Sequence, residues 1–231
     1  MSKTIVQKTI LFSMIVQFIS TIITWDGFYE NLKHSDKILQ EILFAENIVQ
    51  IIEFSFYVWI SYASHKPVDI TPRRYIDWVI TTPTMLISTM VFMEYNNVKK
   101  KGEIISYKSF FKNNWKKIVT IFTNNFFMLL CGFLAEIGYI DLHLGIFVGF
   151  IFFYLTFDNL YDFIQDDREN ENLFKFLVSV WGFYGVAALF DVHTKNVCYN
   201  MLDLVAKNFY GLFIFYKIKE ISVSNTRMIT R

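Results

Sequence analysis

Apolar residues are concentrated in seven blocks along the chain, and polar segments separate these blocks. The blocks span about residues 8–25, 40–63, 73–93, 116–136, 142–160, 174–191 and 196–217. Each is close to the length of roughly 20 residues that an α-helix needs to cross the hydrocarbon core of a bilayer. The charged residues cluster between the blocks and are not spread along amphipathic helices. The pattern therefore predicts an all-α bundle of seven transmembrane helices.

The composition agrees with a chain that is surrounded by lipid. Of the 231 residues, 54% are hydrophobic and 19% are aromatic, and the formal net charge is only +1. We predict one membrane domain over residues 1–220 and a short cytoplasmic tail over residues 221–231, with no soluble module. The first block lacks a cleavage site of small residues, so we expect it to be a helix and not a signal peptide.

The positions of lysine and arginine predict the orientation in the membrane. If the N-terminus is outside, most of these bases lie in the loops after the first, third and fifth helices or in the C-terminal tail. Cytoplasmic loops have such an excess, so we expect an extracellular N-terminus and a cytoplasmic C-terminus. The stretch Lys108–Lys117 interleaves bases with aromatic residues. Beside a membrane span this composition favours contact with anionic lipid, so no nucleic-acid partner is expected.

Other polar residues predict no site. Residues 158–175 are acidic and are expected to form a solvated cytoplasmic loop. Cys131 and Cys198 lie in apolar blocks, and the four histidines lack the spacing of metal ligands, so we predict neither a disulfide nor a metal site. The chain has no Gly-rich phosphate loop and no Ser/His/Asp pattern, so no enzymatic activity is expected.

Several ionisable residues nevertheless lie inside the apolar blocks. A charge at the bilayer centre costs roughly 2.5–3.5 kcal/mol on insertion scales, so each of them suggests a function. Asp203 and Lys207 are four residues apart and share one face of the last helix. Taken alone, this pair is explained equally well by a buried ion pair without any further role.

The third block favours a functional role for this pair over a simple buried ion pair. Residues 74–83 have the sequence Arg-Tyr-Ile-Asp-Trp-Val-Ile-Thr-Thr-Pro. Helical spacing places Arg74, Asp77 and Thr81 on one face. If the third and last helices face one cavity, the two acids, the arginine and the lysine around it have no net charge. The same balance of charge is needed around a protonated Schiff base.

The motif Arg-Tyr-x-Asp-Trp-x-x-Thr-Thr-Pro, together with Asp-x-x-x-Lys in the last helix, resembles the microbial rhodopsins. The resemblance implies all-trans retinal bound covalently as a Schiff base to Lys207. It also implies that Asp77 is the primary counterion and proton acceptor, that Asp203 is the second counterion, and that Arg74 lies on their extracellular side. These residue types fit that role because a buried cation needs anions nearby.

The same resemblance implies a retinal pocket built from the third, fourth and sixth helices. The residues at the matching positions are Trp78, Thr82, Met128, Gly132, Trp181 and Tyr184. Each of them is also an ordinary core residue when it is taken alone. Where relatives have a proline and a second tryptophan, this chain has Gly185 and Ala188, and the fifth helix offers no clear pocket residue.

The pattern of an efficient proton pump is incomplete. Such pumps have a carboxylate on the third helix, three turns beyond the acceptor, but this chain has Ser88 there. The second helix instead has Glu46 and Glu53 on one face, and a rise of about 1.5 Å per residue places Glu53 near mid-membrane. For Glu46, a side chain that simply reaches the cytoplasmic interface explains the sequence equally well.

Polar residues on the first and last helices, namely Ser13, Gln17, Asn200 and Asn208, extend this set. We predict that they line a hydrated route in which carboxylates favour cations. Glu53 and Asn208 are expected to form a hydrogen-bonded constriction on it. The set, including Lys207-Asn208, resembles the group-one viral rhodopsins of giant viruses that infect algae, some of which are light-gated cation channels.

A light-gated cation channel is therefore our first hypothesis, a weak outward proton pump the second, and a photosensor with a separate partner the third. The expected partners are the lipid bilayer and the transported cations, either protons alone or also Na⁺ or K⁺. The resemblance implies a multi-pass integral protein of a host-cell membrane. It leaves an oligomeric assembly open.

Overall fold

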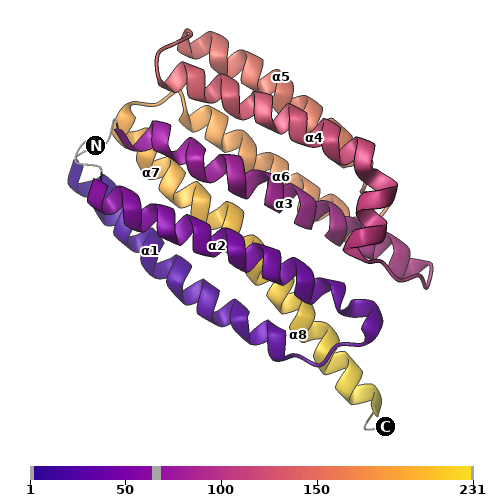
Figure 1. Cartoon of the computed structure of the whole chain (residues 1–231). Coiled ribbons are helices and arrows are strands. Elements are labelled where there is room, and N and C mark those ends of the chain that lie inside the picture. Colours follow the sequence, from indigo (N-terminus) through magenta and orange to yellow (C-terminus); the bar gives the residue numbers. More distant parts are fainter. Residues whose placement is uncertain (1–2, 64–68, 230–231) are drawn as a thin grey trace.

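The computed structural model describes residues 3–63 and 69–229, which form a bundle of seven helices running alternately in opposite directions (Figure 1). The first six helices are α1 (Lys3–Trp25), α2 (Ile38–Ala63), α3 (Ile70–Lys100), α4 (Tyr107–Glu136), α5 (Leu142–Tyr161) and α6 (Arg168–Ala187). The last span consists of α7 (Val192–Asp203), η4 (Leu204–Asn208) and α8 (Phe209–Ile229), which follow one another directly. The predicted all-α, seven-helix fold is confirmed.

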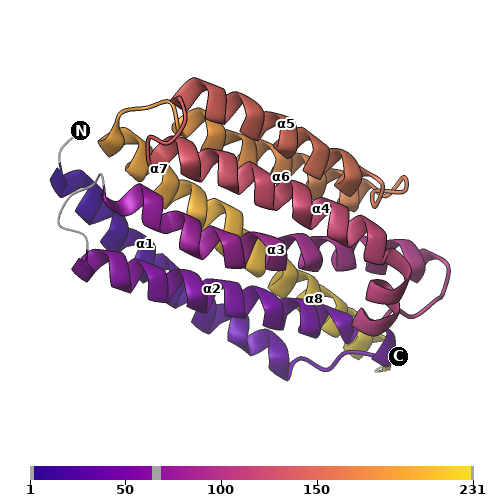
Figure 2. The ribbon, with the colours of Figure 1, turned by 45° about the horizontal axis from the view of Figure 1, so that its top comes forward.

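The two ends of the described chain lie at opposite ends of the bundle (Figures 1 and 2). The N-terminal end of the bundle is the one where α1, α3 and α7 begin, and the C-terminal end is the one where α2, α4 and α6 begin. Short 3₁₀ turns, η1 (Asp26–Tyr29) and η2 (His34–Asp36), connect α1 to α2 at the C-terminal end.

Two helices are longer than the apolar blocks that predicted them. The third block ends near residue 93, but α3 continues to Lys100. The fourth begins near residue 116, but α4 starts at Tyr107, where Ser106 and Ser109 form a capping box. The basic stretch Lys108–Lys117 is therefore part of α4. Hydrophobicity marks only the part of a helix that lies in lipid, whereas capping and packing decide where the helix ends.

Apolar side chains cover much of the outer surface of the bundle, and many polar ones lie inside it. Phe12 and Phe18 are 53% and 57% exposed, whereas Glu46 and Arg74 are completely buried. By length and composition, α1 to α5 are each apolar enough to cross a membrane. In the part of the chain that the structure describes, α6 and the last span are more polar, so their assignment as spans depends on their place in the bundle.

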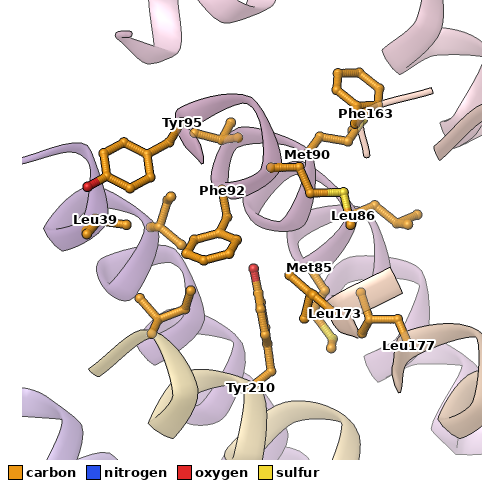
Figure 3. Close-up of a cluster of buried hydrophobic side chains, with 14 of the residues drawn as sticks. Leu39, Met85, Leu86, Met90, Phe92, Tyr95, Phe163, Leu173, Leu177 and Tyr210 are labelled. Carbon is orange, nitrogen blue, oxygen red and sulfur yellow. The ribbon is translucent and has the colours of Figure 1, made fainter. Parts of the chain in front are cut away.

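A cluster of apolar side chains fills the interior toward the C-terminal end of the bundle. Figure 3 shows Met85 and Phe92 of α3 close to Leu173 and Leu177 of α6 and to Tyr210 of α8. Each of these side chains is less than one-tenth exposed. Close packing of this kind, more than exclusion of water, holds helices together inside a bilayer. The cluster packs α3, α6 and α8 against one another at this end.

Asp167 ties the start of α6 to the end of α3. Its Oδ1 accepts a hydrogen bond of 2.8 Å from the backbone N–H of Asn170 and so caps α6. Its Oδ2 lies 2.9 Å from Lys100 Nζ. Burial alone would raise the pKa of Asp167, but the hydrogen bonds from Lys100 and from the Asn170 backbone outweigh it and lower the pKa below its ordinary value of 3.8.

Replacing Asp167 by Asn should lower the thermal unfolding temperature at neutral pH. Asn also caps helices well, so the loss reports the charge and should correspond to about 0.5–1 kcal/mol for a partly exposed pair. Because the folded-state pKa is lowered, this stabilisation is present above the ordinary value and is lost as the pH falls through the folded-state pKa. Thermal unfolding of both proteins in detergent, followed from neutral pH to about pH 3, measures it. A difference that stays constant over that range would contradict the assignment.

Candidate functional site

Lys207 lies inside the bundle, where three carboxyl groups face its amino group. Its Nζ donates a hydrogen bond of 2.5 Å to Asp77 Oδ2. The same Nζ lies 3.8 Å from Asp203 Oδ1 and 3.9 Å from Glu53 Oε1. None of these four side chains is more than 2% exposed. The structure therefore brings Asp77, Asp203 and Lys207 together, and it adds Glu53 from α2.

Both oxygens of Asp203 accept hydrogen bonds. Arg74 Nη1 donates to Oδ2 at 2.9 Å, and Tyr57 donates to the same oxygen at 2.7 Å. Tyr184 donates to Oδ1 at 2.8 Å. Arg74 Nη2 donates in addition to the side-chain oxygen of Asn200. Arg74 thus joins α3 to the last span and lies on the N-terminal side of Lys207.

The site has two cationic side chains and three carboxyl groups, so two of the carboxyl groups are enough to balance its positive charge. Arg74 and Lys207 each donate a hydrogen bond to a carboxylate, Asp203 and Asp77 respectively. In the described part of the chain, neither oxygen of Glu53 has a hydrogen-bond partner. A buried charge without a partner is costly. Glu53 is therefore the member of the cluster whose polar interactions are least complete.

The spacing of residues on the last span explains why these side chains meet. Asn200, Asp203 and Lys207 follow one another by three and four residues, so they share one face. The π-helical turn η4 contains Lys207, and such a turn inserts an extra residue into a helix. As a result Lys207 and the adjacent Asn208 are both buried, at 2% and 3% exposure.

A cavity that includes Lys207 extends between α3, α4, α5 and α6. Part of its empty space is open to the outside. All six residues that the sequence assigns to the pocket line this cavity: Trp78, Thr82, Met128, Gly132, Trp181 and Tyr184.

The cavity also contains residues that the sequence left unassigned. Gly149, Phe150 and Phe153 of α5 line it, as do Gly185 and Ala188, which stand where relatives have other residues. Helix α5 has many phenylalanines with similar surroundings in the sequence, and no pattern distinguished those that face inward.

The residues expected to form an ion route are all buried, but they do not all meet. Glu46 accepts a hydrogen bond from Ser88 and does not extend to the interface. Ser13 donates to the backbone oxygen of Asn200 at 3.1 Å. These contacts join α2 to α3 toward the C-terminal end, and α1 to α7 toward the N-terminal end.

The expected hydrogen bond between Glu53 and Asn208 is absent from the described residues. Asn208 instead donates to Ser20 Oγ at 2.7 Å. The reason is the direction of the side chain, because Asn208 follows Lys207 by one residue and therefore points toward α1 when Lys207 points toward α3.

Gln50 lies between the two glutamates on α2 and was not among the residues expected on the ion route. Its Oε1 accepts a hydrogen bond of 2.9 Å from Thr21 and one of 3.3 Å from Ser20. Asn208 and Gln50 therefore meet at the same hydroxyl group. One feature of the sequence indicated that α1 makes polar contacts inside the bundle. Its polar residues recur every three or four positions and form one polar face of an otherwise apolar helix, at Ser13, Gln17, Ser20 and Thr24.

Gly211 makes room for the Gln50 amide. A Cβ atom at position 211 would lie 2.2 Å from Gln50 Nε2, well inside van der Waals contact. A residue with a Cβ atom at this position would therefore require the Gln50 amide to shift.

Known proteins share this sequence pattern and fold. A family model described as bacteriorhodopsin-like protein matches residues 6–221. The chain is similar to the crystal structure of viral rhodopsin OLPVRII, with 25% sequence identity and a TM-score of 0.81 over 94% of this chain and 98% of that one. No curated protein matches the chain by sequence.

Two other solved structures share the fold at lower identity. One is a blue light-absorbing proteorhodopsin from Med12, with 19% identity and a TM-score of 0.72 over 93% of this chain and 97% of that one. The other is a light-driven proton pump from Leptosphaeria maculans, with 13% identity and a TM-score of 0.70 over 95% and 98%.

Replacing Gly211 by Ala should destabilise the protein, although Ala normally stabilises a helix interior by about 0.5–1 kcal/mol relative to Gly. The new methyl group must displace the Gln50 amide, and overpacking of this kind costs roughly 1–3 kcal/mol. The matched control is Gly182→Ala on α6, where the nearest atom to a new Cβ is 3.8 Å away, so it should be neutral or stabilising. Thermal unfolding in detergent compares the two, and equal unfolding temperatures would refute the close contact.

Proposed function

The chain belongs to the family of bacteriorhodopsin-like proteins, and on this premise we propose that it is a retinal-based photoreceptor acting as a light-gated cation channel. Membership of the family implies retinal bound to a lysine in an integral membrane protein. The attachment site, the ion and the orientation are the specific parts of our proposal. The excess of bases at the C-terminal end supports placing that end in the cytoplasm, with residues 221–231 as a short tail.

We propose Lys207 as the attachment site. Its amino group lies at an apolar cavity, and aromatic residues such as Trp78 and Trp181 form its walls. Asp77 Oδ1 has no hydrogen-bond partner among the described residues, so this carboxylate has acceptor capacity to spare. When it is bound, retinal supplies the absorption of light and a light-driven change of shape.

The residues around Lys207 then hold and move a proton. Asp77, hydrogen-bonded to Nζ, balances the charge on that nitrogen and is placed to accept its proton. Asp203 is the second counterion, and Tyr57 and Tyr184 fix its orientation. Arg74 keeps Asp203 paired and closes the N-terminal side of the site. The apolar wall of the cavity excludes water from the other side.

Replacing Lys207 by Ala should abolish the covalent visible chromophore, because no other described lysine lines the cavity. Absorbance spectra after addition of all-trans retinal, followed by acid denaturation to test for a covalent bond, measure this. Lys195→Ala is the matched control, since Lys195 is also nearly buried but is paired with Glu136 at 2.7 Å near the N-terminal end. A covalent chromophore in Lys207→Ala protein would refute the attachment site.

A single observation supports the channel: buried polar side chains run through the bundle between α1, α2 and the last span. Two carboxyl groups, Glu46 and Glu53, lie on this route and are completely buried. Carboxylates along a route favour cations over anions. The Gln50 amide and its contact with Ser20 lie between the two glutamates, and in our proposal they close the route before illumination. A charge shift at Lys207 acts directly on the adjacent Asn208, which donates to the same Ser20.

A weak outward proton pump is the second candidate. The observation that favours it is the direct hydrogen bond between Lys207 and Asp77, which provides the first step of proton transfer without any open route. Ser88 stands where efficient pumps have their donor, but its hydroxyl contacts the buried carboxyl of Glu46. The two candidates differ in one measurable property: a channel current reverses with voltage, whereas a pump current keeps its direction.

Replacing Glu53 by Gln should change the cation selectivity or the amplitude of the photocurrent and leave the covalent chromophore intact. The substitution keeps the size and hydrogen-bonding capacity of the side chain but removes a negative charge from the route. Voltage-clamp recording under illumination, with sodium and proton gradients in turn, gives the reversal potentials. Glu53→Ala should in addition raise the current in the dark, because it leaves space in the route.

The matched control is Glu41→Gln, which makes the same chemical change on an exposed position of α2. It should leave both reversal potentials unchanged. If Glu53→Gln and Glu53→Ala behave like this control at equal surface expression, Glu53 is not on the route. A wild-type current that keeps its direction at all voltages would favour the pump.

A further inference from the structure

The first turns of α4, at the C-terminal end of the bundle, have lysines on one face and apolar side chains on the opposite face (Figure 1). Lys108, Lys112 and Lys116 follow one another by four residues and are exposed. Phe110 and Ile118, on the opposite face, are buried. The buried face fixes the rotation of the helix, so the three lysines point away from the bundle. They form what we call the basic face of α4.

The basic face has no carboxylate of this chain to pair with. Helix α4 contains neither aspartate nor glutamate before Glu136. Within the part of the chain that the structure describes, none of the three lysines takes part in an ion pair or a side-chain hydrogen bond. Several neighbouring lysines are paired, namely Lys99 with Asp36, Lys100 with Asp167 and Lys117 with Asp162. The positive charge of the basic face is therefore free to attract an anion from outside the chain.

The basic face continues into an apolar surface on the same side of α4. Trp115, Val119 and Phe126 lie on that side and are 61%, 42% and 50% exposed. Tryptophan is enriched where a membrane meets water. Helix α4 has 30 residues and is therefore about 45 Å long, whereas the hydrocarbon core of a bilayer is roughly 30 Å thick. This excess length and the position of Trp115 place the lysines at the level of the lipid headgroups.

We propose that the basic face of α4 binds the headgroups of anionic phospholipids in the leaflet at the C-terminal end of the bundle. Lysines near a membrane surface attract anionic lipids, and their ammonium groups donate charge-assisted hydrogen bonds to phosphate oxygens. The acyl chains of the same lipids lie against Trp115 and Val119. A soluble acidic protein or a nucleic acid would contact the lysines but not these apolar side chains. Binding of this kind requires neither retinal nor an open ion route.

Quenching of Trp115 fluorescence by brominated lipids tests the proposal. The full-length protein is reconstituted in phosphatidylcholine bilayers that contain a small, fixed share of brominated phosphatidylglycerol or brominated phosphatidylcholine. The difference between the wild-type protein and Trp115→Phe gives the signal of Trp115. Quenching by the anionic lipid should exceed quenching by the zwitterionic lipid several-fold, because the lysines enrich anionic lipid beside Trp115. Sodium chloride at about 1 M should reduce this preference, since salt screens exposed charges.

Replacing Lys108, Lys112 and Lys116 together by Gln should bring the quenching by the two lipids close to equality. The matched control replaces Lys33, Lys37 and Lys175 by Gln, which removes the same charge from exposed positions outside α4. It should keep the preference of the wild-type protein.

Equal quenching of the wild-type protein by both lipids would overturn the proposal. A preference that survives in the basic-face variant, or that the control variant loses to the same extent, would also overturn it. If the basic-face variant does not fold, the salt dependence of the wild-type protein decides the question, and a preference that high salt leaves unchanged would exclude binding by exposed lysines.

Discussion

The structure depends on the pairing of charges that are buried at membrane depth. Lys207 and Arg74 are cations without access to water, and each is stable there only because a carboxylate lies within hydrogen-bonding distance. At an effective dielectric constant of 20, two unit charges about 4 Å apart attract each other by about 4 kcal/mol. This attraction fixes α3 against the last span. Tyr57 and Tyr184 extend the same set of interactions to α2 and α6.

The interior of the bundle is apolar on one side of Lys207 and polar on the other. Toward α4, α5 and α6 lies an apolar cavity with aromatic walls, and toward α1 and α2 lie buried amides, hydroxyls and two carboxyl groups. The π-helical turn at η4 places Lys207 at the boundary, with Asn208 on the polar side. Under the proposed function, one lysine would face both the chromophore and the ion route. Light absorption and conduction would then be coupled over the distance between adjacent residues.

Two glycines show how small residues shape both sides of this division. Gly211 allows the Gln50 amide to lie against the backbone of α8 on the polar side. Gly185 allows the Phe150 ring to lie against α6 on the apolar side. In a bilayer the helices are held together largely by close packing, so positions without a side chain decide where they come closest. A larger residue at position 211 would displace the Gln50 amide. A larger residue at position 185 would displace the Phe150 ring from the wall of the cavity.

The sequence by itself determined the number of helices, their approximate extents and the residue types of the candidate site. These are local properties, because each helix satisfies its own backbone hydrogen bonds in lipid and its residues repeat with a fixed period. The shared face of Asp203 and Lys207, and that of Arg74 and Asp77, followed from spacing alone.

The tertiary structure decided that Glu53 faces Lys207, that Asn208 contacts Ser20 and not Glu53, and that Gln50 lies between the glutamates. It also decided which phenylalanines of α5 line the cavity. These features depend on how each helix is rotated and tilted against its neighbours, and that is set jointly by contacts among residues far apart in the chain.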